Sequence, residues 1–256
     1  MEKLEADIVI VGTGASGLFA ALHVPNDKKV LMLTKSDAEN SDSFLAQGGI
    51  CVLRDKNDFD SFMEDTMKAG HYENRKESVE IMINSSRDII NELIGYGVNF
   101  ATKDGELDYT REGAHSKPRI LFHEDITGKE ITSTLLDAVR KLENVTIMEY
   151  VTMTDIIEKD NVCYGVLAKD ANNNEMSIEA GYTIFACGGI GGLYDHSTNY
   201  PHLTGDAIAI AIQHGIKLEN VDYVQIHPTT LYTKKKGRAF LISESVRGEG
   251  AKLYGK

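Results

Sequence analysis

A glycine-rich turn near the N-terminus constrains the fold of this 256-residue chain more than any other feature. The segment Gly12-Thr-Gly-Ala-Ser-Gly17 follows a β-branched apolar run at residues 8–11 and precedes an apolar stretch at residues 18–22. The G-x-G-x-x-G pattern therefore lies between an expected strand and an expected helix, the context in which it indicates a phosphate-binding turn. With residues 29–34 as a second strand, the N-terminus is expected to form a βαβ unit.

Each glycine of this turn has a distinct expected role. Gly12 permits a tight turn, Gly14 lets the backbone approach a pyrophosphate, and Gly17 allows close packing of the helix on the strand. The free N–H groups at the helix N-terminus would then face the phosphate charge. A glycine-rich turn without a ligand is the alternative. The second strand ends in Thr34-Lys35 rather than in the acid that binds ribose hydroxyls, which disfavours a simple NAD dehydrogenase.

Alternating strand and helix patterns predict an α/β fold, with a Rossmann-like domain, a largely parallel sheet and a β-hairpin insertion. Hydrophobic periodicity and turn residues define the remaining elements. The expected helices are residues 59–70, 77–97, 130–142 and a short buried one at 205–215. The expected strands are residues 145–150, a hairpin of 162–168 with 176–184, and a further strand at 184–187.

Composition excludes several classes of protein. Lys and Arg number 27 against 39 Asp and Glu, a net charge of −12, which argues against a nucleic-acid binder. Three widely spaced cysteines rule out a disulfide framework or a cysteine zinc site, and the histidines show no metal-ligand spacing. The acidic start does not resemble a signal peptide, and no apolar segment is long enough to span a bilayer. We therefore expect a cytoplasmic protein without metal or membrane contact.

Six ordered motifs make the assignment more specific. They are Thr34-Lys35, Asp42-Ser-Phe-Leu-Ala-Gln-Gly-Gly49, Ala186-Cys-Gly-Gly189, Thr204-Gly-Asp206, Gln225-Ile-His-Pro-Thr229 and Ser243-Glu-Ser-Val-Arg-Gly-Glu-Gly250. In this order they resemble the flavoprotein family of fumarate reductase, succinate dehydrogenase and L-aspartate oxidase. The resemblance covers the whole chain.

The resemblance implies FAD as the cofactor. Members that attach FAD covalently use a histidine six residues before the Gly-Gly pair, where this chain has Asp42, so non-covalent FAD is expected. The residues expected to contact FAD are Gly12, Thr13, Gly14, Ala15, Ser16, Gly17, Lys35, Asp42, Ser43, Phe44, Leu45, Ala46, Gln47, Gly48, Gly49, Thr152, Gly188, Gly189 and Asp206. Cys187, beside the last Gly-Gly pair, is interpreted as a packing substitution and not as a nucleophile.

The segment Tyr109-Thr-Arg-Glu-Gly-Ala-His-Ser116 is similar to one in the L-aspartate oxidase branch, where the glutamate orients the substrate ammonium group. A carboxylate such as Glu112 repels a dicarboxylate ligand unless that ligand also carries a positive charge. The resemblance therefore implies oxidation of L-aspartate to iminoaspartate, with oxygen or fumarate as acceptor, as the first step of quinolinate and NAD synthesis. A solvated Arg–Glu loop is the alternative for Glu112.

Basic residues cluster in and after the same segment. Arg111, His115, Lys117 and Arg119 are expected to give it a local positive potential, although some of them would only solvate the loop.

The C-terminal motifs supply the other expected substrate residues. By resemblance, His227 and Ser243 contact substrate carboxylates, and Glu244 and Arg247 match a proton-relaying pair of the fumarate reductases. A core histidine satisfied by backbone is the alternative for His227. A surface ion pair is the alternative for Glu244 and Arg247, which lie three residues apart.

Length limits the functional expectation. Family members are roughly twice as long, so the chain resembles their N-terminal half, with an incomplete FAD-binding domain at 1–219 and the beginning of a capping domain at 220–256. The family's catalytic arginine would follow Lys256, so the chain alone is expected to be inactive. The alternatives are a soluble fumarate reductase-like enzyme and a non-catalytic FAD-binding module, and quinolinate synthase is a candidate partner.

Overall fold

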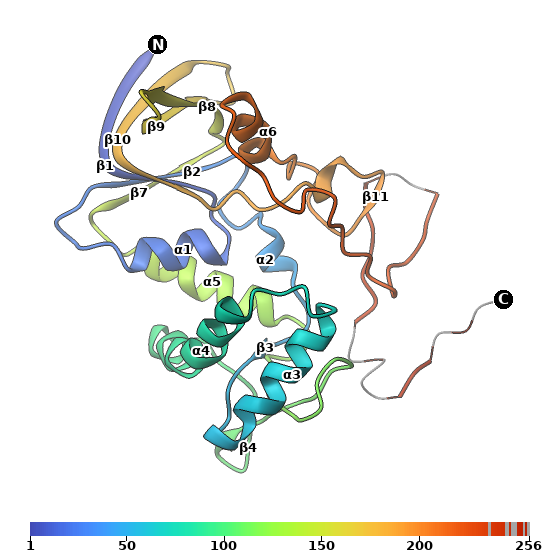
Figure 1. The fold of residues 1–256 in the computed structure, drawn as a ribbon. Helices are drawn as coiled ribbons and strands as arrows, with labels where there is room; N and C mark the ends of the chain where they lie inside the picture. Colours follow the sequence, from blue (N-terminus) through green and yellow to red (C-terminus); the bar gives the residue numbers. More distant parts are fainter. Residues whose placement is uncertain (235–236, 244–245, 247–249, 253, 255–256) are drawn as a thin grey trace. The chain divides into compact units, whose positions relative to one another are not determined.

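The computed structural model describes residues 1–234, 237–243, 246, 250–252 and 254 (Figure 1). The chain forms two compact units, which we describe separately. The sheet unit comprises Met1–Phe44 and Leu135–Leu241, and the helical unit comprises Leu45–Thr134 and the described residues from Ile242 onward. The functional boundary expected at residues 219–220 stays a prediction.

A six-stranded sheet forms the centre of the sheet unit, in the order β7-β2-β1-β10-β9-β8. The strands are β1 (Glu2–Val11), β2 (Val30–Thr34), β7 (Val145–Glu149), β8 (Thr152–Lys159), β9 (Val162–Lys169) and β10 (Glu175–Phe185). The pairs from β7 to β10 are parallel, whereas β10–β9 and β9–β8 are antiparallel. The expected largely parallel sheet and hairpin are confirmed, and β8 extends the hairpin to three antiparallel strands.

The register of β1 explains why only its second half was predicted. Ile8–Val11 of β1 pair with β2 on one side and β10 on the other, whereas the first residues of β1 pair with β10 alone. Val9 and Ile10, on opposite faces of the sheet, are both fully buried. Lys3 to Ala6 instead alternate charged and apolar residues, which suits a strand with one exposed face and an open edge.

Helices pack on this sheet through a few apolar side chains each. They are α1 (Ala15–Leu22), the C-terminal part of α5 (Thr127–Val139) and α6 (Asp206–Gln213) (Figure 1). α6 contacts β8 and buries Ile210, but Ile212 is 64% exposed, so the expected buried helix is buried on one side only.

The strand expected at residues 184–187 is not separate, which corrects that prediction. Ile184 and Phe185 are the last residues of β10, and Ala186 and Cys187 follow its end. Glu175 of β10 pairs with β9 alone, and positions 176–179 pair with both β1 and β9. The remaining positions of β10 pair with β1 alone. Continuous pairing with β1 therefore makes one long strand of what the sequence indicated as two.

The helical unit is built around two packed helices, α3 (Phe59–Ala69) and α4 (Lys76–Tyr96) (Figure 1). Val79 and Ile83, one turn apart on α4, pack with Phe62 of α3 and with Leu53. The shorter elements are α2 (Asp42–Leu45) at the boundary, the 3-10 turn η1 (Lys56–Asp58), and the strand pairs β3 (Ile50–Cys51) with β6 (Ile120–Leu121) and β4 (Thr102–Lys103) with β5 (Glu106–Leu107). Within the described residues, every helix is too short or too polar to cross a bilayer.

Candidate functional site

An open pocket of about 910 Å³, counted together with the solvent space at its mouth, lies in the sheet unit. Its walls include Val11, Lys35 and Ala186, which lie at the carboxyl ends of β1, β2 and β10. The start of α6 and residues 40–43 complete it. Open α/β sheets bind their ligands in this position, outside the carboxyl ends of parallel strands.

The glycine turn forms one wall of the pocket. Gly12 has φ +117°, a conformation that favours glycine, and a Cβ there would clash with the carbonyl oxygen of Ala186. A Cβ at Gly17 would in turn clash with the carbonyl oxygen of Gly12. Gly14 caps the N-terminus of α1, which has no side-chain cap and no acid in its first turn. The wall thus presents backbone and a helix N-terminus, which fits the pyrophosphate of a dinucleotide.

Residues 40–43 are hydrogen-bonded to the glycine turn and to residues 199–200. The N–H of Ala15 donates to the Ser43 hydroxyl at 3.1 Å. The Asp42 carboxylate accepts hydrogen bonds from the Asn199 side-chain amide and, at 3.0 Å, from the Tyr200 backbone N–H. The Asp42 carboxylate, at the position where the covalent members of the family have a histidine, therefore accepts hydrogen bonds from the protein itself.

Lys35, which replaces the expected acid at the end of β2, has an acidic partner from another element. Its Nζ lies 2.6 Å from Asp206 Oδ2 and 2.8 Å from Thr204 Oγ1. The Thr204 hydroxyl donates to Asp206 Oδ1 at 2.7 Å. Asp206 is in the first turn of α6, where a carboxylate also complements the helix dipole. A carboxylate therefore does reach this edge of the pocket, from a residue far along the chain.

Cys187 lines the pocket but is a poor nucleophile. Burial, with the nearby Asp206 carboxylate, raises the pKa of its thiol to about 11. Its Sγ lies 3.5 Å from the Val11 carbonyl oxygen. Both facts agree with its interpretation as a packing residue.

The structure brings many of the expected FAD residues together. Those that line the pocket are Gly12, Thr13, Gly14, Ser16, Lys35, Asp42, Ser43, Gly188, Gly189 and Asp206. Ala15, Gly17, Phe44 and Thr152 lie in the same unit behind this lining, and Val151 and Met153 form the wall on either side of Thr152. The residues of the Gln-Gly-Gly segment, Leu45, Ala46, Gln47, Gly48 and Gly49, belong to the helical unit.

Sequence reasoning missed several pocket residues. Asn40 and His202 both line the pocket, and His202 Nε2 lies 3.1 Å from the Asn40 carbonyl oxygen. Neither residue belongs to a recognised motif. Thr204 could have been found, because it opens the Thr-Gly-Asp motif whose aspartate was included.

In the helical unit, the Tyr109–Ser116 segment, which we call the substrate loop, lies against the Gln-Gly-Gly segment. A Cβ on Gly48 would lie 3.1 Å from Glu112 Oε1. A Cβ on Gly49 would clash with Ile120 and with the Leu121 carbonyl, because β3 and β6 pair closely there. The Glu112 carboxylate also helps, after burial, to raise the pKa of Cys51 to about 11. The Glu112 carboxylate, which is proposed to bind the substrate, therefore lies next to a segment that is proposed to contact the flavin.

The basic residues after this loop do not provide the expected positive potential. Arg119 is fully buried, with a bidentate pair to Asp58 and a 2.5 Å contact to Asp65. Lys117 Nζ lies 3.4 Å from Asp58 Oδ1. Burial lowers the pKa of His115, and Arg119 lowers it further, which favours the neutral ring. For Lys117 and Arg119 the expectation fails because the neutralising aspartates come from η1 and α3, whereas for Arg111, which is exposed, it stays a prediction.

The remaining expected substrate residues are dispersed. His227 is half-buried in the sheet unit, and Thr229 donates its backbone N–H to His227 Nδ1 at 3.3 Å. Ser243, in the helical unit, donates to Asp125 Oδ1 at 2.5 Å. Glu244 and Arg247 lie outside the described residues. Their roles, like those of Glu112 and His227, stay predictions.

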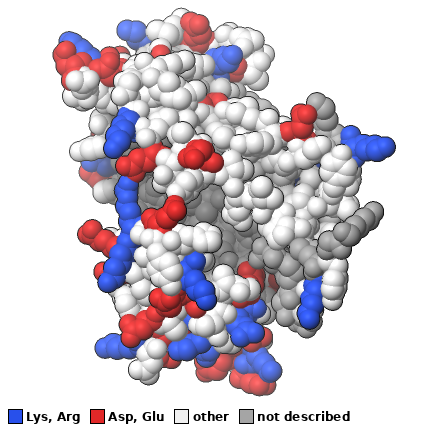
Figure 2. Space-filling view, turned by 45° about the vertical axis from the view of Figure 1, so that its right-hand side comes forward, with Lys and Arg blue, Asp and Glu red and all other residues white. Residues whose placement is uncertain are grey.

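Charge on the described surface is mixed. Figure 2 shows Lys and Arg interspersed with Asp and Glu on the face that it draws, without a continuous basic area among its described residues.

Comparisons with known proteins agree with a dinucleotide site in this pocket. Curated L-aspartate oxidases from Clostridium perfringens and Clostridium acetobutylicum are 46% and 47% identical to the chain over 98% of its length. The chain covers 57% and 58% of these two proteins, so it spans little more than half their length.

Solved structures give the same fold. An E. coli quinol fumarate reductase FrdA structure matches 98% of the chain with a TM-score of 0.90 and 27% identity, and the chain covers 43% of it. Mycobacterium smegmatis Sdh1 matches 97% with a TM-score of 0.86 and 29% identity, and the chain covers 44% of it. The family model described as "FAD binding domain" matches residues 7–256. The glycine turn, the pocket at the ends of the parallel strands and this match lead to one conclusion: the chain belongs to the FAD binding domain family.

Proposed function

We propose that the protein containing this chain is an FAD-dependent L-aspartate oxidase. It converts L-aspartate to iminoaspartate, with oxygen or fumarate as electron acceptor, and so begins quinolinate and NAD synthesis. The similarity to L-aspartate oxidases supports this proposal. The observation that carries it is the position of the Glu112 carboxylate beside Gly48, next to a segment expected to contact FAD.

The residues of the sheet-unit pocket would hold the dinucleotide without a covalent bond. The glycine turn and the α1 N-terminus suit the pyrophosphate, and Lys35 with Asp206 offers donors and acceptors at the end of β2. Asp42 is an acceptor held by Asn199 and Tyr200, and a carboxylate there would not form the histidyl bond of the covalent enzymes. FAD, when bound, would accept a hydride, which is two electrons and one proton, from the substrate.

Glu112 would select the substrate by charge. A carboxylate next to the substrate pairs with the ammonium group of aspartate but repels the unsubstituted dicarboxylates fumarate and succinate. A hydrogen bond to a charged group contributes about 1.5–3 kcal/mol. His227 and Ser243 would bind the substrate carboxylates, and Glu244 with Arg247 would relay a proton.

A second candidate, a fumarate reductase-like enzyme of the same fold, is favoured by the TM-score of 0.90 to the quinol fumarate reductase chain. Glu112 separates the two, because aspartate carries a positive charge that can pair with this carboxylate, whereas fumarate and succinate carry none. A non-catalytic FAD-binding module is the third candidate. A flavin spectrum that does not bleach with aspartate would favour the module.

The decisive experiment compares Glu112→Gln with Glu106→Gln in the complete native protein loaded with FAD. Glu106 is an exposed carboxylate six residues earlier, on β5. We expect Glu112→Gln to lower kcat/KM for aspartate by roughly 10- to 100-fold and to leave fumarate reduction unchanged or a few-fold faster, because the repulsion of fumarate is removed, whereas Glu106→Gln changes neither. Equal losses with aspartate and fumarate would contradict the assignment of the ammonium group to Glu112.

The cellular setting belongs to the same proposal. We infer a cytoplasmic enzyme whose product passes to quinolinate synthase, because iminoaspartate hydrolyses readily in water. Co-purification of the native protein with quinolinate synthase, at a constant ratio through two chromatographic steps, would support a physical complex.

A further inference from the structure

The buried Arg119 has several side-chain partners within the helical unit, and the proposed function does not use it. Its guanidinium donates to both oxygens of Asp58 at 3.0 and 2.9 Å, to Asp65 Oδ2 at 2.5 Å and to Ser61 Oγ at 3.0 Å. It also lies over the Phe62 ring, 4.9 Å from the centroid. All of these partners lie on η1 and α3, so Arg119 anchors its own strand end to that helix.

Asp65 extends the anchor to the substrate loop. Its Oδ2 accepts hydrogen bonds from both the backbone N–H and the hydroxyl of Ser116, each at 2.7 Å. One carboxylate oxygen therefore receives Arg119 and the last residue of the loop. Burial would raise the pKa of Asp65, but the hydrogen bonds from Ser116 and Arg119 lower it.

His115 provides a second connection, on the other side of the loop. Its Nδ1 lies 3.0 Å from Arg119 Nη1, which can only donate, so Nδ1 accepts and the proton of the neutral ring is on Nε2. Nε2 lies 3.3 Å from Cys51 Sγ, at the end of β3. Cys51 pairs with Ile120, the residue that follows Arg119.

We propose that Arg119 is a positioning residue that fixes the substrate loop, and with it Glu112, against the Gly48–Gly49 backbone. It acts through Asp65 on Ser116 and through His115 on Cys51. His115 lies three positions after Glu112, and the His115 N–H donates to the Glu112 carbonyl at 3.0 Å, so the two ends of this turn move together. Its functional meaning, the orientation of the carboxylate that selects the substrate, rests on the proposed function.

A lysine cannot replace Arg119 in this arrangement. The guanidinium spans two carboxylates, a hydroxyl and a ring nitrogen with a planar fork, whereas an ammonium has three donors at one point. Arg119→Lys keeps the charge and most of the buried volume but loses the geometry. It therefore separates positioning from simple charge balance.

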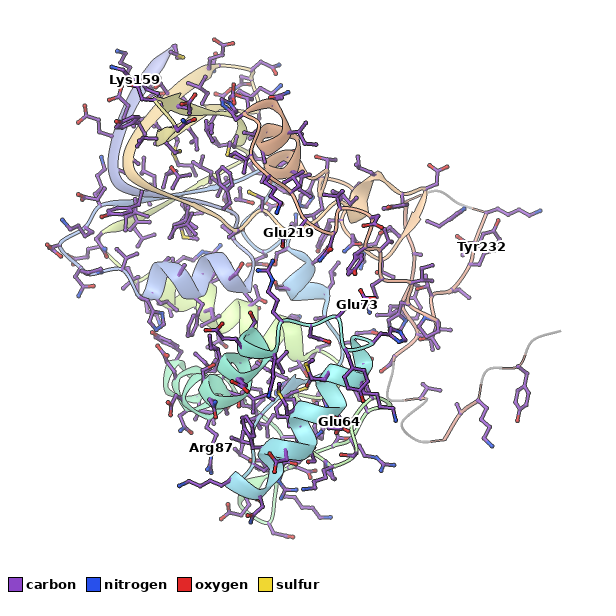
Figure 3. All side chains as sticks on the ribbon, viewed as in Figure 1. Glu64, Glu73, Arg87, Lys159, Glu219 and Tyr232 are labelled. Carbon is purple, nitrogen blue, oxygen red and sulfur yellow. The ribbon has the colours of Figure 1, made fainter. Side chains whose placement is uncertain are left out.

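The test uses Arg119→Lys, Asp65→Asn and Ser116→Ala in the complete protein with FAD bound. Glu64→Gln is the matched control, because Glu64 is the preceding residue of α3 but is exposed and bonded to Tyr72 at 2.6 Å (Figure 3). Hydrogen exchange of the amides of residues 110–116 is compared with exchange of the α4 amides. Ser116→Ala removes only a hydroxyl and tests the connection if the two buried substitutions prevent folding.

We expect exchange in the loop to rise at least fivefold in Arg119→Lys and Asp65→Asn and about twofold in Ser116→Ala, with α4 and the Glu64→Gln control unchanged. KM for aspartate should rise about tenfold in the first two variants, with a smaller change in kcat. Unchanged loop exchange, or a uniform rise across α4 and the loop, would overturn the positioning role. If the parent protein does not oxidise aspartate, the proposed function fails, and the exchange comparison still decides whether Arg119 fixes the loop.

Discussion

Lys35 Nζ lies 2.6 Å from Asp206 Oδ2, so the cation that follows β2 is bound by a carboxylate in the first turn of α6. Both side chains are about one-quarter exposed and both line the dinucleotide pocket. Substitution of either residue should therefore affect the cofactor and the docking of α6 together.

Asp206→Asn should weaken FAD binding. The substitution leaves Lys35 without its carboxylate and removes an acid from the start of α6, so we expect a Kd about tenfold higher and a loss of about 1 kcal/mol in stability. Flavin fluorescence titration and urea unfolding measure the two effects. Glu219→Gln, which removes an exposed partner of Lys217, is the control. An unchanged Kd for Asp206→Asn would contradict a role at the cofactor.

Gly12→Ala should weaken FAD binding at least as much as Asp206→Asn does. An alanine there must adopt φ near +117° and its Cβ meets the Ala186 carbonyl, so the turn has to rebuild. We expect at least tenfold weaker binding and a cost of about 1–3 kcal/mol. Gly95→Ala is the matched control, because that glycine is helical and has no atom within 4 Å of the added Cβ. It should stabilise α4 by up to about 1 kcal/mol.

The buried arginine cluster should make stability sensitive to acid. Burial raises the pKa of Asp58, but hydrogen bonds from Arg119 and Ser61 outweigh it and lower the pKa from its ordinary 3.8 to about 2. A carboxyl whose pKa falls on folding stabilises the protein above its unfolded pKa. That contribution, roughly 2 kcal/mol, is lost as pH falls from about 4 towards 2.

Asp58→Asn tests this dependence through urea unfolding between pH 2 and 7. The variant leaves Arg119 buried with one carboxylate fewer, so a loss of about 3–5 kcal/mol is expected at neutral pH. The difference from the parent protein should shrink at pH 2, where the parent also loses the Asp58 charge. A difference that stays constant with pH would show that the Asp58 charge is not responsible.

The alkylation rates of the cysteines should reflect the pKa of each thiol and whether FAD covers it. With pKa values of about 11, Cys51 and Cys187 are almost entirely thiols at pH 8, so alkylation should be roughly 100-fold slower than for an unperturbed thiol. FAD should slow Cys187 further, since it lines the pocket, and should not slow Cys163, which does not. Glu112→Gln should accelerate Cys51, because the Glu112 carboxylate contributes to its raised pKa. Mass spectrometry of each peptide measures the rates.

Local patterns predicted the parts of the fold whose cause is local. The strand at residues 8–11 was evident because those positions are buried on both faces, and α4 because its apolar residues recur at helical spacing and Gly97 ends it with φ +107°. β8 was missed, since it is an edge strand whose hydrogen-bonding partner in the sheet is β9. β10 was divided at Ile184, although its pairing with β9 ends at Glu179 and its pairing with β1 continues to Phe185.

In the candidate site, too, the features with a local cause were predicted and those that depend on distant residues were not. The glycine turn was found because one short segment contains everything that the backbone geometry requires. Arg119 was expected to add to a local positive potential, because Asp58 and Asp65, which neutralise it, lie 61 and 54 residues earlier and only the folded chain brings them to it. Lys35 and Thr204, 169 residues apart, are a similar case.

The pairing of β2 with β7 has a consequence for how such proteins can diversify. Residues 45–134 leave the sheet unit after β2 and return before β7, so the two strands on either side of this excursion are themselves hydrogen-bonded neighbours. The excursion contains Glu112 and its anchor, whereas every residue that lines the dinucleotide pocket lies outside it. Insertions, deletions and substitutions between Ile50 and Thr134 would therefore change which acid is recognised, while the register of the sheet and the residues that line its pocket stay the same.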